Sequence, residues 1–203
     1  TGLLAAERRD VPIAAVCADF TRPFTLPRIA DDSAPELGFF PGSSIGNFSR
    51  AEAAEFLRGS HQVLSGSNAG FLIGIDLRKA PAILNAAYND SEGVTAAFNL
   101  NLLVRANREL GADFDLDAFR HHAFYNEDEG RIEMHLISLR EQQVRIGEHR
   151  FDFAADEPIH TENSYKYAPE EFQALARSAG YSPERVWIDE DRLFSLHYLL
   201  ADS

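Results

Sequence analysis

The sequence predicts an α/β protein in which a doubly wound, largely parallel sheet is interrupted by an α+β insertion. Two observations support this prediction. Short apolar runs alternate with helical segments before residue 77 and again after residue 168, the order typical of a doubly wound sheet. Between them the pattern changes to a long helix and a polar hairpin. We therefore expect one domain from residues 1–77 and 168–203, with a second domain from residues 78–167 inserted into it.

Three strands are expected in the first part of the chain. Residues 11–18 (VPIAAVCA) are apolar on both faces, which suits a parallel strand covered by helices, and residues 1–10 read as the end of a preceding helix. Further strands are predicted at residues 37–40 and 70–76. Ligands bind at the carboxyl ends of such strands.

The helices are predicted from their end signals. Ser49-Arg-Ala-Glu52 is a capping box, and the helix that it begins is expected to end at Gly59. A long helix is expected from residue 93 to residue 110, ended by Gly111, and a short one after Asp115. The core-facing residues of the long helix are expected to be Val94, Ala97, Phe98 and Leu102.

The rest of the chain predicts strands around one more helix. Residues 131–136 alternate polar and apolar, and residues 143–153 continue as a hairpin that turns at Gly147. Pro169 begins a helix that Gly180 ends. Residues 181–188 and 193–200 then form a terminal antiparallel pair.

Composition restricts the partners of the chain. Lys and Arg number 19 against 32 Asp and Glu, which gives the 203 residues a formal net charge of −13. Such a surface repels nucleic-acid phosphates and anionic lipid, so we expect neither partner. Without a signal-peptide pattern or an apolar run of about 20 residues, a cytoplasmic protein is expected. The single cysteine, Cys17, is expected to be a small buried hydrophobe.

Asp19 and Phe20 close the first apolar run. At the end of a strand, an aspartate can accept a hydrogen bond from an adenine amine while the next backbone N–H meets a ring nitrogen. Turn-forming aspartates are common, so the residues alone favour a second interpretation, in which Asp19 caps a turn.

The loop Gly42-Ser-Ser-Ile-Gly-Asn47 lies between a predicted strand and a predicted helix. Glycine lets the backbone approach a ligand closely, and the Asn47 amide offers a donor and an acceptor to a zwitterionic amino acid. An ordinary strand-to-helix loop has the same composition, so both interpretations stay open.

The segment Thr161-Glu-Asn-Ser-Tyr-Lys-Tyr167 places polar side chains directly before a helix. Glu162 and Ser164 are two residues apart, so in extended chain they point to the same side. A carboxylate and a hydroxyl aimed together can bind the two nitrogens of an imidazole. The alternative is a solvated edge segment. The seven histidines show no metal-ligand spacing, and we predict no metal site.

Together these segments resemble the histidine-specific Nα-methyltransferases, which use S-adenosylmethionine to make hercynine, the first intermediate of ergothioneine biosynthesis. The resemblance covers nearly the whole chain. It rests on the order and spacing of Asp19-Phe20, Gly42–Asn47, Ala87–Asp90 followed by Gly93–Asn99, Ile132–Met134 and Glu162–Tyr167. It implies a class I, Rossmann-like methyltransferase fold with an inserted substrate-binding domain, and the terminal antiparallel pair agrees with that fold by analogy.

The resemblance also implies how the cofactor is bound. Asp19 and Phe20 would hold the adenine of S-adenosylmethionine, and Gly42 would lie beside its reacting end. No side chain is expected to act as a strong general base, because the sulfonium is a good leaving group.

The substrate side is implied by five residues. Asn47 and Tyr88 would hold the carboxylate and amino group of L-histidine. Glu162 and Ser164 would bind the imidazole, with Met134 lining that part of the pocket.

The resemblance leaves one motif unaccounted for. The family's Gly-rich first motif and its ribose-binding acidic residue precede Thr1, so the N-terminal part of the fold is expected upstream and this chain alone is expected to be inactive. The full-length enzyme is expected to be monomeric. The alternatives are a related methyltransferase acting on another aromatic amino acid or amine, and a non-catalytic fragment or module.

Overall fold

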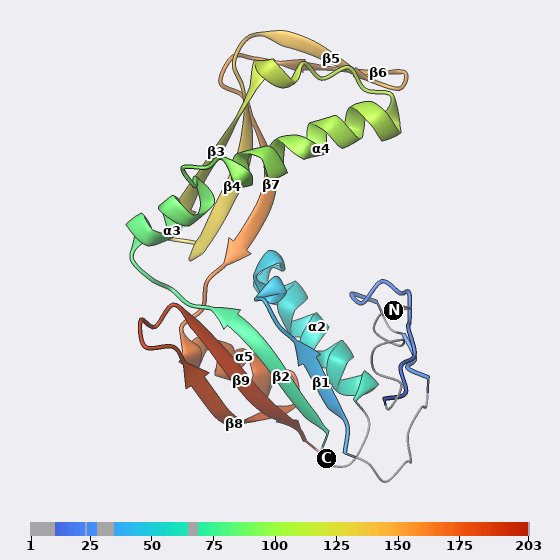
Figure 1. Cartoon of the computed structure of the whole chain (residues 1–203), viewed down its shortest axis with the longest axis vertical. Helices are drawn as coiled ribbons and strands as arrows, with labels where there is room; N and C mark the ends of the chain where they lie inside the picture. The colour runs from blue at the N-terminus through green and yellow to red at the C-terminus, as the bar shows by residue number, and fades with distance from the viewer. Residues whose placement is uncertain (1–10, 23, 28–34, 65–68, 203) are drawn as a thin grey trace.

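The chain folds around two main sheets that lie at opposite ends of an elongated molecule (Figure 1). The computed structural model describes residues 11–22, 24–27, 35–64 and 69–202. The helix end expected in residues 1–10 lies outside the described residues.

The first sheet has four strands. Their order is β1 (Leu37–Phe40), β2 (Gly70–Asp76), β9 (Phe194–Ala201) and β8 (Tyr181–Ile188). β1 and β2 are parallel, whereas β9 is antiparallel to both of its neighbours. The predicted α/β fold and its terminal antiparallel pair are therefore confirmed, but the described sheet is mixed rather than largely parallel, because only β1 and β2 run in the same direction.

Two helices pack against one face of this sheet. α2 (Arg50–Val63) begins at the predicted capping box, and α5 (Pro169–Ser178) begins at Pro169. Ala53 and Leu57 of α2 and Phe172 of α5 are fully buried with Ile73 of β2 in one core. The end of α2 predicted at Gly59 was wrong. A helical glycine costs about 1 kcal/mol, too little to end a helix whose buried face holds it on the sheet.

Residues 11–18 form no strand, contrary to the prediction. Val11, Ile13 and Val16 are 43%, 41% and 44% exposed, and Cys17 is exposed rather than buried. A strand exists only where a neighbouring backbone completes its hydrogen bonds. Residues 11–18 pair with none of the described strands, and β2 is the one described partner of β1.

The second sheet has three antiparallel strands. Their order is β3 (Phe119–Asn126), β4 (Arg131–Ser138) and β7 (Pro158–Tyr165). α3 (Pro81–Tyr88) and α4 (Val94–Leu110) contact this sheet (Figure 1). The long helix, the β4 strand and the hairpin of β5 (Gln142–Ile146) and β6 (His149–Phe153) confirm the predictions. So does the short helix after Asp115, η2 (Leu116–Ala118).

The predicted core face of α4 was wrong. Val94 and Phe98 are each 64% exposed and Leu102 is 45% exposed, whereas Asn99 and Leu103 are buried. Asn99 is buried because its amide nitrogen donates to the backbone oxygen of His135 (3.1 Å) and also contacts Nδ1 of His121 (3.0 Å). The face of α4 that packs on the sheet thus includes a polar residue beside Leu103.

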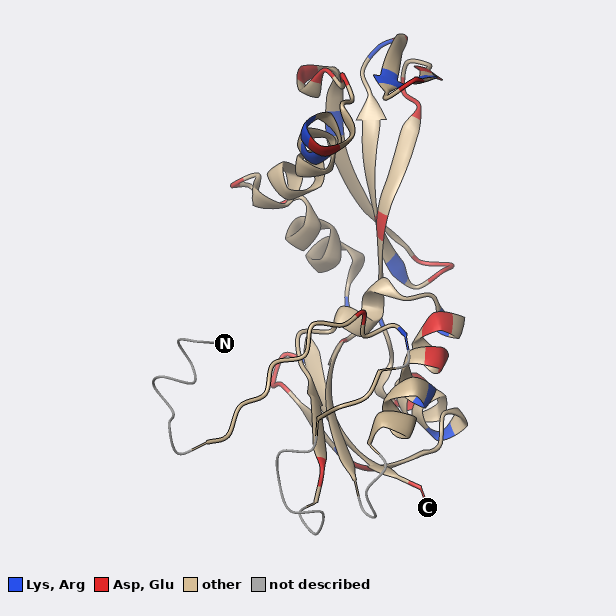
Figure 2. Ribbon diagram, turned by 90° about the vertical axis from the view of Figure 1, so that its right-hand side faces the viewer, with Lys and Arg blue, Asp and Glu red and all other residues tan. Residues whose placement is uncertain are grey.

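Acidic and basic residues occur in both the upper and the lower part of the molecule (Figure 2). Arg105 pairs with Glu109 at 3.1 Å and Arg140 with Asp115 at 2.7 Å. Exposed pairs of this kind contribute at most about 1 kcal/mol each. None of the described helices is long and apolar enough to cross a membrane.

The two sheets are joined by two adjacent stretches of chain. Leu77 and Tyr167 form an isolated parallel bridge, and the Tyr167 N–H donates to the backbone oxygen of Asp76 (3.2 Å). This bridge lies where the sequence places the start and end of the inserted domain. We retain the division into residues 1–77 with 168–203 and residues 78–167 as a proposal that this junction supports.

Candidate functional site

Strand β7 carries the side chains of Glu162 and Ser164 on one face, near the junction of the two sheets. Its pairing with β4 shifts between Met134 and His135, so that one extra residue of β7, Thr161, is accommodated as a bulge. The bulge reverses the alternation of side chains along the strand. His160 therefore pairs with His135, while Glu162 pairs with Met134 and points to the other face of the sheet.

The loop after β1 packs directly on this strand. η1 (Ser44–Asn47) is a short 3₁₀-helix in which Gly46 is buried. A methyl group on Gly46 would lie 2.8 Å from the backbone oxygen of Tyr165 and 3.6 Å from Oγ of Ser164. The glycine thus permits the backbone contact that brings the next residue, Asn47, to Glu162, with which it hydrogen bonds.

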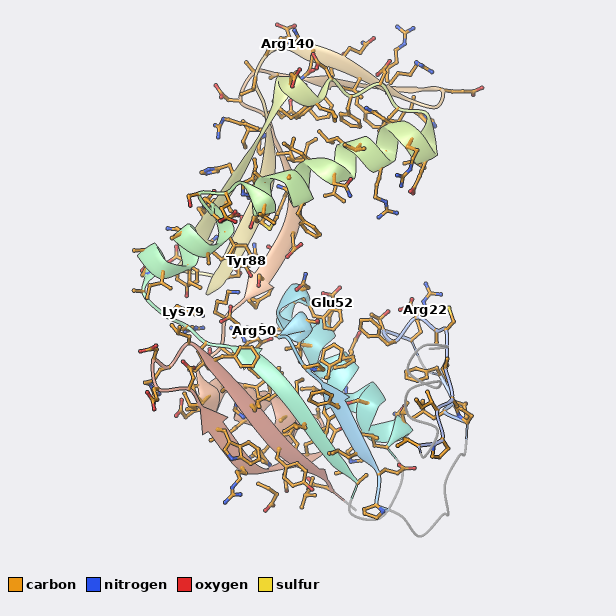
Figure 3. All side chains as sticks on the ribbon, viewed as in Figure 1. Arg22, Arg50, Glu52, Lys79, Tyr88 and Arg140 are labelled. Atoms are coloured by element: carbon orange, nitrogen blue, oxygen red, sulfur yellow. The ribbon has the colours of Figure 1, made fainter. Side chains whose placement is uncertain are left out.

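Tyr88, at the end of α3, completes the group from the other side. Its hydroxyl donates to Oγ of Ser164 (2.8 Å) and accepts from Nζ of Lys166 (2.9 Å). The same ammonium donates to Ser164 (2.8 Å) and pairs with Asp76 at the end of β2 (2.7 Å). Figure 3 shows Tyr88 above Lys79, where the two sheets meet.

The pocket beside this group has a volume of 410 Å³ and is lined by Asn47, Thr161 and Glu162, together with His160 and Asn163. Burial raises the pKa of Glu162, while the hydrogen bond from Asn47 and the positive charge of Lys166 lower it. A carboxylate that is partly desolvated and held by few donors is a strong acceptor for a ligand N–H.

Met134 lies on the same side of the sheet. It is 2% exposed and packs with Leu84, Ala123 and Ile132 in a small core between the sheet and α3. The structure therefore brings all five predicted substrate residues to one end of the second sheet. Their roles toward a substrate stay predictions.

The residues predicted to bind the cofactor are arranged differently. Asp19 Oδ1 accepts from the N–H (3.0 Å) and the hydroxyl (2.6 Å) of Thr21, and Oδ2 pairs with Arg22 (3.2 Å). The hydroxyl of Thr21 contributes most to lowering the pKa of Asp19, followed by its N–H. This is the turn-capping arrangement that the residues alone favoured, and the adenine contact stays a prediction.

Phe20 lines a larger, apolar cavity. This cavity has a volume of 690 Å³, and Phe40, Phe56 and Phe71 also line it. The ring of Phe20 lies 5.8 Å from that of Phe40 and 6.1 Å from that of Phe56. The two cavities share no lining residue, and Arg22, beside the larger one, lies on the far side of α2 in Figure 3.

Gly42 lies in the loop between β1 and η1. Its φ is +79°, a conformation that favours glycine, and the space where a side chain would extend holds no atom within 4 Å. The next residue, Ser43, fixes the loop to the end of β2, because its hydroxyl accepts from the N–H of Asp76 (2.8 Å). Open space beside a strand end is compatible with the predicted cofactor contact.

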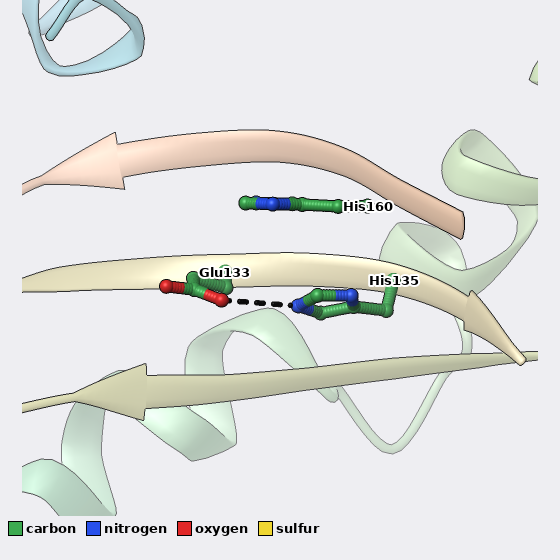
Figure 4. A group of neighbouring side chains, drawn as sticks. All are labelled: Glu133, His135 and His160. Atoms are coloured by element: carbon green, nitrogen blue, oxygen red, sulfur yellow. Dashed lines mark hydrogen bonds and ion pairs between the residues drawn. The ribbon is translucent and has the colours of Figure 1, made fainter. Parts of the chain in front are cut away.

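A cluster on the opposite face of the second sheet was not expected from the sequence. Glu133, His135 and His160 bring one oxygen and two nitrogens within 4.8 Å of one another (Figure 4). The Glu133 carboxylate already accepts from Arg131 (2.8 Å) and from Asn126 (3.0 Å). That guanidinium disfavours a second cation, and the prediction of no metal site stays a prediction.

Lys166 and Gly46 are the site residues that sequence reasoning missed. Both belong to segments that the sequence singled out, but their roles depend on contacts with residues 78 or more positions away in the chain. For Lys166 a signal was present: it continues the alternation of Glu162 and Ser164 on one side of an extended segment.

Comparison with known proteins identifies relatives over most of the chain. A family model described as "Histidine-specific methyltransferase, SAM-dependent" matches residues 1–201. The histidine N-alpha-methyltransferase of Mycolicibacterium smegmatis is 42% identical over 196 residues, which are 95% of this chain and 60% of that protein. That of Mycobacterium tuberculosis is 42% identical over 193 residues, 94% of this chain and 59% of that protein. The chain therefore spans about 60% of the length of these relatives.

Among solved structures, an S-adenosylmethionine-dependent methyltransferase from Clostridium acetobutylicum aligns with 99% of this chain and 70% of its own chain. The TM-score is 0.48 and the sequence identity is 11%.

Proposed function

Because the chain belongs to the histidine-specific, S-adenosylmethionine-dependent methyltransferase family, we propose that the full-length protein methylates the α-amino nitrogen of L-histidine. Three successive transfers from S-adenosylmethionine would give hercynine. The reaction would take place in the cytoplasm on a free amino acid, and the 410 Å³ pocket lined by Asn47 and Glu162 opens beside these residues.

One observation carries the proposal. Glu162 and Ser164 lie on the same side of β7, beside Asn47 and Tyr88 from two other segments. Residues two apart on a strand are separated by about 6.6 Å, a distance that a five-membered ring with a hydrogen bond on each side can span. The pair thus suits the two ring nitrogens of histidine, and Met134 supports the strand beside it.

The described residues are suited to bind two parts of the cofactor, the adenine and the end that carries the methyl group. The aromatic cavity at Phe20 offers ring faces against which an adenine can stack, and the open backbone at Gly42 permits close approach of the group that carries the methyl. Asp19 would have to exchange its contact with Thr21 for the adenine amine. The cofactor supplies an electrophilic methyl group on a sulfonium.

The residues of this chain would then position the amino acid. Ser164 and Glu162 hold the ring, while the Asn47 amide offers hydrogen bonds to the carboxylate. Tyr88 keeps one oxygen lone pair free of the contacts to Lys166 and Ser164, and this lone pair accepts from the substrate's amino group. Holding two reactants in place is worth up to about 7–11 kcal/mol of the barrier in favourable cases.

A substrate with another aromatic ring is the competing possibility. An indole has one N–H and no ring acceptor, so it would leave either Glu162 or Ser164 without a partner. A buried polar group left unpaired costs about 1–3 kcal/mol. The site therefore favours histidine.

The proposal is tested by incubating the full-length protein with S-adenosylmethionine and either L-histidine or L-tryptophan, with product masses read over time. We expect mono-, di- and trimethylated histidine in succession. Preferential methylation of tryptophan, or no methylation of histidine at any protein concentration, would refute it.

A further inference from the structure

We propose that Lys166 is a positioning residue that fixes the direction of the hydrogen bond offered by Ser164. The site would thereby select a ring that carries one N–H and one lone pair. This inference rests on the proposed function, because it concerns how the same pocket recognises the imidazole.

The Lys166 side chain is buried in the junction between the two sheets. The residue is 1% exposed, and its ammonium contacts Asp76 (2.7 Å), Ser164 (2.8 Å) and Tyr88 (2.9 Å). An ammonium has three N–H groups and no lone pair, so these contacts use all of its hydrogens and each partner must accept. Lys166 therefore imposes a direction on the two hydroxyls beside it.

Ser164 accepts twice. Its Oγ receives one hydrogen bond from Lys166 and another from the Tyr88 hydroxyl (2.8 Å). A serine oxygen has two lone pairs, and both are occupied by these donors. The hydroxyl hydrogen is then all that Ser164 can offer to a ligand, so the ligand must present an acceptor.

Glu162 requires a hydrogen-bond donor on the ligand, whereas Ser164 requires an acceptor. Its carboxylate, two residues earlier on the same side of β7, only accepts when it is ionised. A neutral imidazole satisfies both groups, because one nitrogen carries a hydrogen and the other a lone pair. An imidazolium or an indole offers donors only, and would face the Ser164 hydrogen with a hydrogen of its own.

Lys79 provides a matched control. Its ammonium pairs with the other oxygen of Asp76 (2.5 Å), whereas Ser164 and Tyr88 accept from Lys166. Lys79→Met and Lys166→Met each remove one ammonium from Asp76, but only Lys166→Met releases a lone pair of Ser164.

The test measures binding by calorimetry to the full-length protein. The ligands are L-histidine and the two pyrrolylalanine isomers, in which one ring nitrogen is replaced by carbon so that the lone pair is lost. The unchanged protein is expected to prefer histidine over the better isomer by roughly 5- to 150-fold, the cost of one unpaired buried hydroxyl. In Lys166→Met this preference is expected to fall severalfold, because Ser164 can turn its hydrogen to Tyr88.

Two further variants complete the design. Lys166→Arg retains donors and is expected to keep most of the preference, as is Lys79→Met. Tyr88→Phe removes the second donor to Ser164 and is expected to lower the preference, and it serves as the test if Lys166→Met does not fold.

The outcomes separate this inference from the proposed function. If Lys166→Met weakens the binding of all three ligands equally, Lys166 has a structural role only and the inference is overturned. The same holds if the preference is unchanged. If Lys166→Met does not fold, an unchanged preference in Tyr88→Phe shows that occupied lone pairs do not fix the Ser164 hydroxyl, which also overturns the inference. If the unchanged protein binds no histidine, the proposed function fails first, and this inference fails with it.

Discussion

Replacing Gly46 by alanine tests whether close packing of the η1 loop on β7 builds the site. The added methyl would lie 2.8 Å from the Tyr165 backbone oxygen and 3.5 Å from its nitrogen. The first distance is shorter than side-chain carbons accept, and neither neighbour can rotate away because both belong to the backbone. The loop must therefore move away from the strand, and Asn47 must move with it.

The magnitude follows from the packing. Forcing one extra methyl into a fully packed position costs about 1–3 kcal/mol, and in a chain of this size each kcal/mol lowers Tm by about 2–4 °C. Histidine binding should weaken as well, since Asn47 would lose its hydrogen bond to Glu162.

Gly59→Ala is the matched control. Gly59 lies within α2, and a methyl there has no atom within 4 Å. Alanine in a helix is more stable than glycine by about 1 kcal/mol, so this variant should raise Tm and leave histidine binding unchanged. Thermal unfolding and calorimetry of both variants provide the test. A Gly46→Ala protein with unchanged Tm and unchanged histidine affinity would refute the packing argument.

Three other changes have defined outcomes. Asp76→Asn should lower the free energy of unfolding by about 3–5 kcal/mol, because the buried Lys166 ammonium loses its counter-charge; denaturant unfolding that matches the unchanged protein would contradict this. Burial lowers the pKa of His197 from 6.5 to about 4, so its contribution of about 3 kcal/mol is present above pH 6.5 and is lost as pH falls toward 4. The loss should be absent in His197→Gln unfolded over the same pH range. Asp19→Ala should weaken the binding of S-adenosylmethionine and of S-adenosylhomocysteine to the same extent, as measured by calorimetry. Normal affinities with a lower Tm would instead show that Asp19 only caps the turn with Thr21.

Elements with local end signals were predicted well from the sequence. The capping box at Ser49, the glycines that flank α4 and the proline at the start of α5 act through a few neighbouring residues. The apolar run at residues 11–18 was misassigned because apolar character alone cannot show that a partner strand exists. β3 was missed for a related reason: it is a strand because its backbone pairs with β4, and its sequence FRHHAFYN does not show that pairing.

The candidate site shows the same division. Glu162 and Ser164 could be placed on one side of β7 by counting residues, and the fold agrees. The bulge at Thr161, which turns His160 to the opposite face, depends on the register with β4 and leaves no trace in the sequence. The burial of Lys166 depends on Asp76, which is distant along the chain and adjacent only after the two connecting stretches meet.

The central claim, that Glu162 binds the imidazole of histidine, is tested most directly by calorimetry of Glu162→Ala in the full-length protein. Loss of this half-buried carboxylate should weaken the binding of L-histidine by about 2–5 kcal/mol and leave the affinity for S-adenosylhomocysteine unchanged. Glu148→Ala, an exposed carboxylate in the turn between β5 and β6, should change neither. Unchanged histidine affinity in a folded Glu162→Ala protein would contradict the account.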